Sequence, residues 1–189
     1  RTSPVRAEAS DILHSADQAA GLRRLFRRTP SAVVALFTSG RAPRDLAVQT
    51  LLALTEGARR IVAIDEHGPE RGSLLAAFGY PEAGDLLGAL QGPFEVSDTM
   101  REVAEGLWVV PAAAAALAVP LLDDAQHARL ESAIAELQRR ADLLAIHTTG
   151  DARNLTPFAR AAGRRLLVVE ASGVGARGAC QWIKGLAAA

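Results

Sequence analysis

The stretch AVVALFTSGRAPRDLAVQTLLAL, residues 32–54, determines the fold that we predict for this 189-residue chain. It begins with a continuous apolar run at 32–37 and, after a short loop, continues with a helical pattern at 45–54. Continuous apolar runs are typical of strands in parallel sheets, because helices bury both faces of such sheets. The stretch therefore predicts a strand, a loop and a covering helix, which is the repeating unit of an α/β protein.

The same alternation of strand-like and helical patterns continues along the rest of the chain. Crossovers between parallel strands are almost always right-handed, which reduces the number of possible arrangements of such units. We predict an α/β fold with a doubly wound, mainly parallel sheet of about five strands in a three-layer α/β/α arrangement. The further strands are expected at 60–65, 107–110, 142–147 and 165–170, and the further helices at 73–90, 124–140, near 155–162 and near 175–188.

Composition excludes several classes of function. The chain has 21 basic and 21 acidic residues, so no net charge attracts it to nucleic acid or to an anionic membrane. The single cysteine, Cys180, cannot form an internal disulfide and suits a reducing cytosol. The apolar stretch 109–122 contains two prolines and is shorter than the roughly 20 residues of a membrane span. We therefore expect a cytoplasmic protein with no nucleic-acid partner and no direct membrane anchor.

The residues ahead of the first strand predict a separate helix. From 15 to 28, apolar residues recur at steps of three and four, while four arginines occupy the other face. This spacing is typical of a short amphipathic helix. Pro30 ends the helix, because proline cannot continue the helical hydrogen-bond pattern.

The loop after the first strand, residues 38–45, bears on nucleotide binding, because open parallel sheets bind ligands beyond the carboxyl ends of their strands. A phosphate-binding loop needs several glycines, whose backbone N–H groups approach the phosphates, and a lysine. This loop has one glycine, Gly40, and no lysine, and Pro43 lacks a backbone N–H. We therefore expect neither ATP nor Mg²⁺ as a cofactor.

Several segments, taken in order along the chain, resemble the MinD/ParA family of ATPases. Each segment is short, and their shared order carries the resemblance, which covers most of residues 30–189. It implies the SIMIBI/MinD-like three-layer fold. It also implies a domain that is shortened at its C-terminal end, because the family's further strands and adenine-contacting segment are missing. The matching segments are 38–40 with 46–54, 64–67 with 74–90, 106–112, 146–150, and 164–170 with 179–186.

The resemblance implies a vestigial nucleotide site. His67 stands where the family has the second aspartate of its Asp-x-Asp strand end, and His147 replaces the aspartate that organises magnesium and water. With Asp65, the two histidines offer donors that suit a divalent metal, but the loss of two aspartates favours a lost magnesium site, so we assign no metal. The chain is then a pseudo-ATPase without catalytic residues, and a monomer rather than an ATP-sandwiched dimer. The vestigial site comprises Gly40, Arg41, Asp65, His67, His147 and Thr149.

The N-terminal helix resembles a more specific group. Residues 17–23 fit the Asp-Gln-Ala-x-x-Leu-Arg pattern found ahead of the ATPase domain in the FlhG/FleN regulators of flagellar number. The resemblance implies that this helix binds the signal-recognition-type GTPase FlhF and stimulates its GTP hydrolysis. Apolar positions suit a groove on the partner, and polar ones suit its switch loops or attacking water. The residues implied in partner binding are Asp17, Gln18, Ala19, Leu22 and Arg23.

Two regions with different roles follow. We interpret residues 1–29 as a flexible leader plus a partner-docking helix, and 30–189 as a degenerate MinD/ParA-like domain that its partner recruits to the cell pole or membrane. The helix can instead pack on its own domain as an ordinary amphipathic helix. Two further functions stay open: a residual ATPase in which Arg41 or Arg44 compensates the phosphate charge, and a MinD-like adaptor in cellulose secretion or cell-pole organisation.

Overall fold

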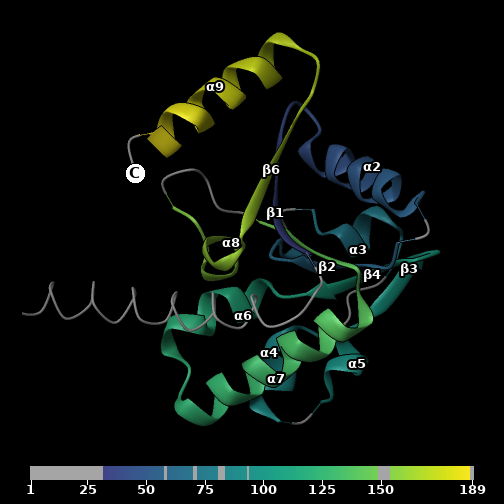
Figure 1. The fold of residues 1–189 in the computed structure, drawn as a ribbon, viewed down its shortest axis with the longest axis vertical. Coiled ribbons are helices and arrows are strands. Elements are labelled where there is room, and N and C mark those ends of the chain that lie inside the picture. Colours follow the sequence, from purple (N-terminus) through teal and green to yellow (C-terminus); the bar gives the residue numbers. More distant parts are fainter. Residues whose placement is uncertain are drawn as a thin grey trace, which may run out of the picture.

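A six-stranded sheet forms the middle layer of the fold (Figure 1). In spatial order its strands are β3 (Arg101–Ala104), β4 (Leu107–Pro111), β2 (Ile61–Asp65), β5 (Leu143–His147), β1 (Ala32–Ser39) and β6 (Arg164–Val169). All neighbouring strands pair in parallel except β3, which is antiparallel to β4. The computed structural model describes residues 32–57, 59–69, 72–80, 84–92, 94–148 and 154–187.

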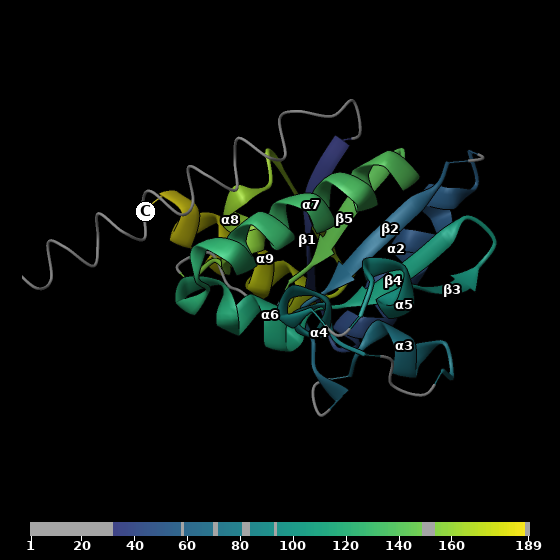
Figure 2. The same ribbon diagram turned by 90° about the horizontal axis from the view of Figure 1, so that it is seen from below.

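Helices cover both faces of the sheet (Figures 1 and 2). Along β2, Ile61 and Ala63 belong to one hydrophobic core, while Val62 and Ile64 belong to the other, and all four are fully buried. This arrangement explains the continuous apolar runs, because every residue of a central strand packs against a helical layer. The first face is covered by α2 (Pro43–Thr55) and α3 (Leu74–Ala77). The second is covered by α4 (Leu86–Gln91), α5 (Val96–Thr99), α6 (Ala113–Ala118), the 3₁₀ helix η2 (Val119–Leu121), α7 (Asp124–Arg140) and α8 (Pro157–Ala161).

The last helix, α9 (Gly173–Ala187), lies over β1 and β6. The ring of Trp182 contacts that of Phe37 in β1, with centroids 4.0 Å apart. The start of the helix approaches the strand ends so closely that a Cβ at Gly175 would overlap the backbone carbonyl of Glu170. Small residues at the start of α9 thus permit close packing against the carboxyl ends of these strands.

The expected single helix over 73–90 is wrong. The structure has two short helices, α3 and α4, in its place. Gly79 adopts a positive φ of 75°, and the N–H of Tyr80 donates to the carbonyl of Leu75 at 3.0 Å. This left-handed glycine ends α3, as it commonly does at helix C-termini. Asp85 then caps the start of α4 by accepting a hydrogen bond from the N–H of Leu87 at 2.9 Å.

Sequence patterns also missed the edge strand β3. Its residues are half-buried or exposed and include Arg101 and Glu102, so the strand lacks the apolar run that marks the others. β3 and β4 form a hairpin whose turn contains Gly106, with a φ of 74°. A Cβ at Gly106 would lie 3.1 Å from the carbonyl oxygen of Arg59, so the turn favours glycine both in conformation and in space.

The predicted three-layer α/β/α class and the five predicted parallel strands are confirmed. The predicted helix at 124–140 coincides with α7, whose start is capped reciprocally by Asp123 and Gln126. The predicted N-terminal helix, including residues 17–23, lies outside the described residues, as does Thr149. Within the described part of the chain, no helix is both long and apolar enough to cross a membrane.

Candidate functional site at the carboxyl edge of the sheet

Asp65 and His147 are brought together by strand register. Asp65 is the last residue of β2 and His147 the last of β5, and the two are direct partners across these neighbouring parallel strands. Both side chains are almost completely buried, with 1% and 3% of their surface exposed. His67 follows two residues after Asp65, so three residues of the predicted site meet at one edge.

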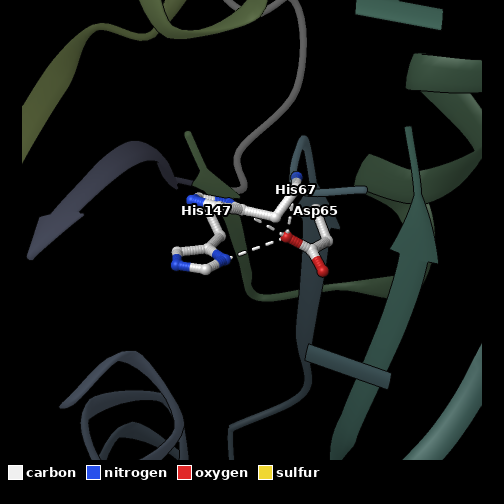
Figure 3. A group of neighbouring side chains, drawn as sticks. All are labelled: Asp65, His67 and His147. Carbon is white, nitrogen blue, oxygen red and sulfur yellow. Dashed lines mark hydrogen bonds and ion pairs between the residues drawn. The ribbon is translucent and has the colours of Figure 1, made fainter. Parts of the chain in front are cut away.

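The Asp65 carboxylate is held by three donors, and Figure 3 draws the two histidines beside it. Its Oδ1 pairs with Nδ1 of His147 at 2.9 Å and accepts the backbone N–H of His67 at 3.2 Å. Its Oδ2 accepts the backbone N–H of Leu74, at the start of α3, at 2.6 Å. These contacts set the direction of the carboxylate, because each oxygen has a fixed partner.

The two imidazoles stack on each other beside this carboxylate. Their ring centroids lie 4.1 Å apart with an interplanar angle of 20°. Nδ1 of His67 lies 3.4 Å from the same Oδ1 of Asp65, and the His67 side chain is 19% exposed. Asp65, His67 and His147 each offer one donor atom, and all three donor atoms lie within 4.8 Å of one another. These residues are the ones in the described site that can hold a metal.

Burial and hydrogen bonds set the charges of this cluster. Burial raises the pKa of Asp65, but the hydrogen bonds from His147 and His67 outweigh it and bring the pKa to about 2. Burial lowers the pKa of His147, against the attraction of Asp65. At neutral pH, Asp65 is therefore a carboxylate and His147 a neutral imidazole, which is the form that binds metals.

Glu66, between two of the predicted residues, is a buried acid that sequence patterns did not single out. Burial raises the pKa of its carboxyl group, against hydrogen bonds from Thr148 and Thr156. The hydroxyl of Thr156 donates to Glu66 Oε2 at 2.8 Å. The signal for Glu66 was present, because it directly follows a strand at the edge where the ligand-binding loops lie.

The loop after β1 contacts a different acid, Glu170, which follows the last residue of β6. The backbone N–H of Arg41 donates to Glu170 Oε2 at 2.5 Å. A Cβ at Gly40 would lie 2.7 Å from the Cβ of Glu170, so glycine is needed for this approach. The N–H of Glu170 in turn donates to the carbonyl of Ser39 at 2.8 Å. Gly40 and Arg41 are therefore joined to Glu170, a residue that the sequence analysis did not predict in the site.

The start of α2 presents few groups to an anion. Pro43 stands in its first turn without an N–H, and no side chain caps this end. Arg44 forms an exposed ion pair with Asp45, with Nε 3.4 Å from Oδ1, and its Cδ would lie 3.2 Å from a Cβ at Gly72. Of the two arginines considered for phosphate, Arg44 is thus turned towards the loop that precedes α3.

A pocket of about 240 Å³ lies beside the histidine cluster. Of the three clustered residues, His67 forms part of its wall. The rest of the wall includes Gly68, Pro69, Asp85, Pro111 and Ala113.

Comparison with known proteins identifies the fold. No family model matches the sequence, and no curated protein matches it significantly. Among solved structures, the chain is similar to cobyrinic acid a,c-diamide synthase from Mycobacterium smegmatis, with a TM-score of 0.56 and 21% identity over 84% of this chain and 66% of that one. A Cyanothece McdA–ATP complex has a TM-score of 0.56 and 18% identity over 85% of this chain and 64% of that one. The MinC:MinD cell division complex of Aquifex aeolicus has a TM-score of 0.57 and 19% identity over 84% of this chain and 64% of that one.

The chain thus spans just under two thirds of the length of these structures, with shares of 66%, 64% and 64%. The sequence segments that resemble the MinD/ParA family contain strands and helices of this fold in the same order along the chain. The chain therefore has the three-layer fold of the MinD/ParA-type P-loop ATPases.

Proposed function

We propose that this chain is a MinD/ParA-like regulator that does not hydrolyse ATP and acts by binding another protein. The contact of Glu170 with the loop after β1 carries the proposal. In a phosphate-binding loop, backbone N–H groups point at the phosphates. Here the N–H of Arg41 donates to a carboxylate that also lies against Gly40. A negative charge at this place repels phosphate and occupies a donor that phosphate needs.

Three other features support the loss of nucleotide binding. The loop at 38–45 has no lysine, and Pro43 removes a donor from the first turn of α2. At the neighbouring strand ends, Asp65 is already engaged by three donors, and His147 stands at the end of β5. A hard cation such as Mg²⁺ prefers oxygen ligands, so these imidazoles fit it poorly.

For the partner we propose an FlhF-type signal-recognition GTPase, whose GTP hydrolysis the chain stimulates in setting flagellar number or placement. The pattern at 17–23 supports this choice. A complex of MinD with the protein MinC shows that this fold takes protein partners in another system. Recognition by a short helix needs only a few anchor side chains in a groove, which a degenerate domain can still present.

Calorimetry with ATP and Mg²⁺ tests the first part of the proposal. We expect no saturable binding up to millimolar ATP, because the loop lacks lysine and faces a carboxylate. Tight, magnesium-dependent binding would contradict the proposal and favour a residual ATPase in which the exposed loop residue Arg41 compensates the phosphate charge. The ATP complex of the structurally similar McdA makes this the second candidate.

Single-turnover GTP hydrolysis tests the partner. The full chain should accelerate hydrolysis by an FlhF-type GTPase, and Gln18→Ala together with Leu22→Ala should abolish the acceleration. A matched control, Gln91→Ala with Leu121→Ala, removes the same two side-chain types from exposed positions outside the N-terminal helix and should leave the acceleration unchanged. Equal rates with both double variants would reject the helix as the docking element and leave the adaptor function open.

A further inference from the structure

Asp65, His67 and His147 form a donor set that the proposed function does not use. We propose that these three residues bind one divalent transition-metal ion, with Zn²⁺ as the best-suited probe. This inference goes beyond the sequence analysis, which assigned no metal to the chain. It is also independent of nucleotide, because all three donors come from the chain itself.

The chemistry of the donors selects the class of ion. Two imidazole nitrogens and one carboxylate oxygen suit zinc, cobalt, nickel and ferrous iron. Mg²⁺ and Ca²⁺ prefer sites made only of oxygen ligands. Three protein ligands also leave an open coordination position, as in zinc sites that keep a bound water.

The distances in the cluster match those between ligands that share one ion. Two ligands each bound about 2.0–2.1 Å from zinc, at angles of 90–109°, lie about 2.9–3.4 Å from each other. Nδ1 of His147 and Nδ1 of His67 lie 2.9 and 3.4 Å from Oδ1 of Asp65. The remaining separation, between the two histidine donors, is within 4.8 Å. His67 lies on a loop and its side chain is 19% exposed, so rotation of its ring can shorten the distance between the two histidine donor atoms.

The surroundings hold the ligands in place for binding. Oδ2 of Asp65 is engaged by the N–H of Leu74, which leaves Oδ1 directed at both imidazoles. Such hydrogen bonds to a ligating carboxylate orient it and increase metal affinity. Asp65 and His147 terminate two paired strands, so their backbones are held by the sheet. Only His67 needs to adjust.

Two features of the cluster are explained by a bound dication. Nδ1 of His67 is buried and makes no well-formed hydrogen bond within the described residues, since its contact with Oδ1 of Asp65 is 3.4 Å long, although such atoms normally find a close partner. The neighbouring carboxyl groups of Asp65 and Glu66 are both buried, at 1% and 4% exposure, and buried acidic groups beside nitrogen donors suit a dication. The pocket walled by His67 supplies the route of entry.

Titration of the full chain tests the site. After dialysis against a chelator, the protein is titrated with ZnCl₂ by calorimetry and with CoCl₂ by visible absorption. We expect one equivalent to bind, with a ligand-field spectrum for Co²⁺ that reports nitrogen ligation. His67→Gln should weaken the affinity at least about tenfold, because it removes a ligand. The matched control is His127→Gln on α7, whose ring pairs with the Asp123 carbonyl, and it should bind like the wild type.

A second measurement keeps the test decisive if a buried variant fails to fold. Zn²⁺ should raise the midpoint of thermal unfolding of the wild type and of His127→Gln, and much less that of His67→Gln. Absence of 1:1 binding, equal affinity in His67→Gln, or displacement of Zn²⁺ by equimolar Mg²⁺ would each overturn the proposal. Failure of zinc binding leaves the ATP and GTPase tests unaffected, since neither involves this ion.

Discussion

The carboxyl edge of the sheet contains two acidic residues that do opposite things. At the end of β6, Glu170 turns its carboxylate onto the loop after β1 and occupies the N–H of Arg41. At the end of β2, Asp65 is buried and gathers two imidazoles around one oxygen. The first acid occupies a backbone donor of the loop in which we propose that phosphate no longer binds. The second organises nitrogen donors where a magnesium-binding protein would need oxygen. Under the functions that we propose, one half of this edge is closed to phosphate and the other half binds a transition metal.

Replacement of Asp65 should have the largest effect on this comparison. Asp65→Ala leaves two backbone donors and the His147 ring without their buried acceptor. We expect a loss of about 3–5 kcal/mol in the free energy of unfolding, as when one partner of a buried charged pair is removed. Urea denaturation measures it, with Glu131→Ala, at an exposed position of α7, as a control for loss of an acid. A loss below about 1 kcal/mol would mean that the buried cluster is not held by this carboxylate.

A methyl group at Gly40 should test the closed half. Gly40→Ala puts a Cβ 2.7 Å from the Cβ of Glu170, and we expect a cost of about 1–3 kcal/mol from overpacking. In a Glu170→Gly background, which lacks the opposing Cβ and the carboxylate, most of this cost should disappear, and a double-mutant cycle measures the coupling. Gly163→Ala is the matched control, because a Cβ there meets nothing within 4 Å. Additive effects of the two changes would contradict contact between the loop and Glu170.

Removal of the charge on Glu170 should have a smaller effect. Glu170→Gln keeps an oxygen for the N–H of Arg41 and removes the repulsion of phosphate. We expect ATP affinity to rise by no more than about tenfold, or ~1.4 kcal/mol, because the loop still lacks lysine and further glycines. Calorimetry of this variant beside Glu136→Gln measures the difference. Micromolar affinity would show that the carboxylate alone excludes nucleotide.

A third carboxylate, Asp142, lies at the opposite edge of the sheet and should matter least. The backbone N–H of Arg60, followed by its guanidinium, lowers the pKa of Asp142. Because the pKa is lower in the folded state, the carboxylate stabilises the protein at pH values above the unfolded-state pKa of 3.8. This stabilisation is lost as the pH falls through the folded-state pKa. Asp142→Asn should therefore unfold at a slightly lower temperature than wild type at pH 7, with the difference vanishing below the folded pKa. A difference that persists in acid would assign the effect to packing instead of charge.

Local signals predicted much of the fold because they depend on neighbours in the sequence. The apolar runs identified the five parallel strands, and the helical pattern at 124–140 identified α7 with both ends correct. The helix expected over 73–90 was wrong because Gly79, with its left-handed conformation, outweighed the apolar spacing around it. The edge strand β3 was missed because a half-exposed strand carries no apolar run.

The sequence by itself determined that Asp65, His67 and His147 stand at strand ends, and hence that they share an edge, since parallel strands all end on the same side. Only the tertiary structure decided that they meet, because the β2–β5 register sets Asp65 opposite His147. The role of Glu170 could not be read from local patterns. Its contact with Arg41 joins residues 129 positions apart and exists because β1 lies next to β6. Strand order is a property of the packed sheet, because it depends on contacts between segments that lie far apart in the sequence.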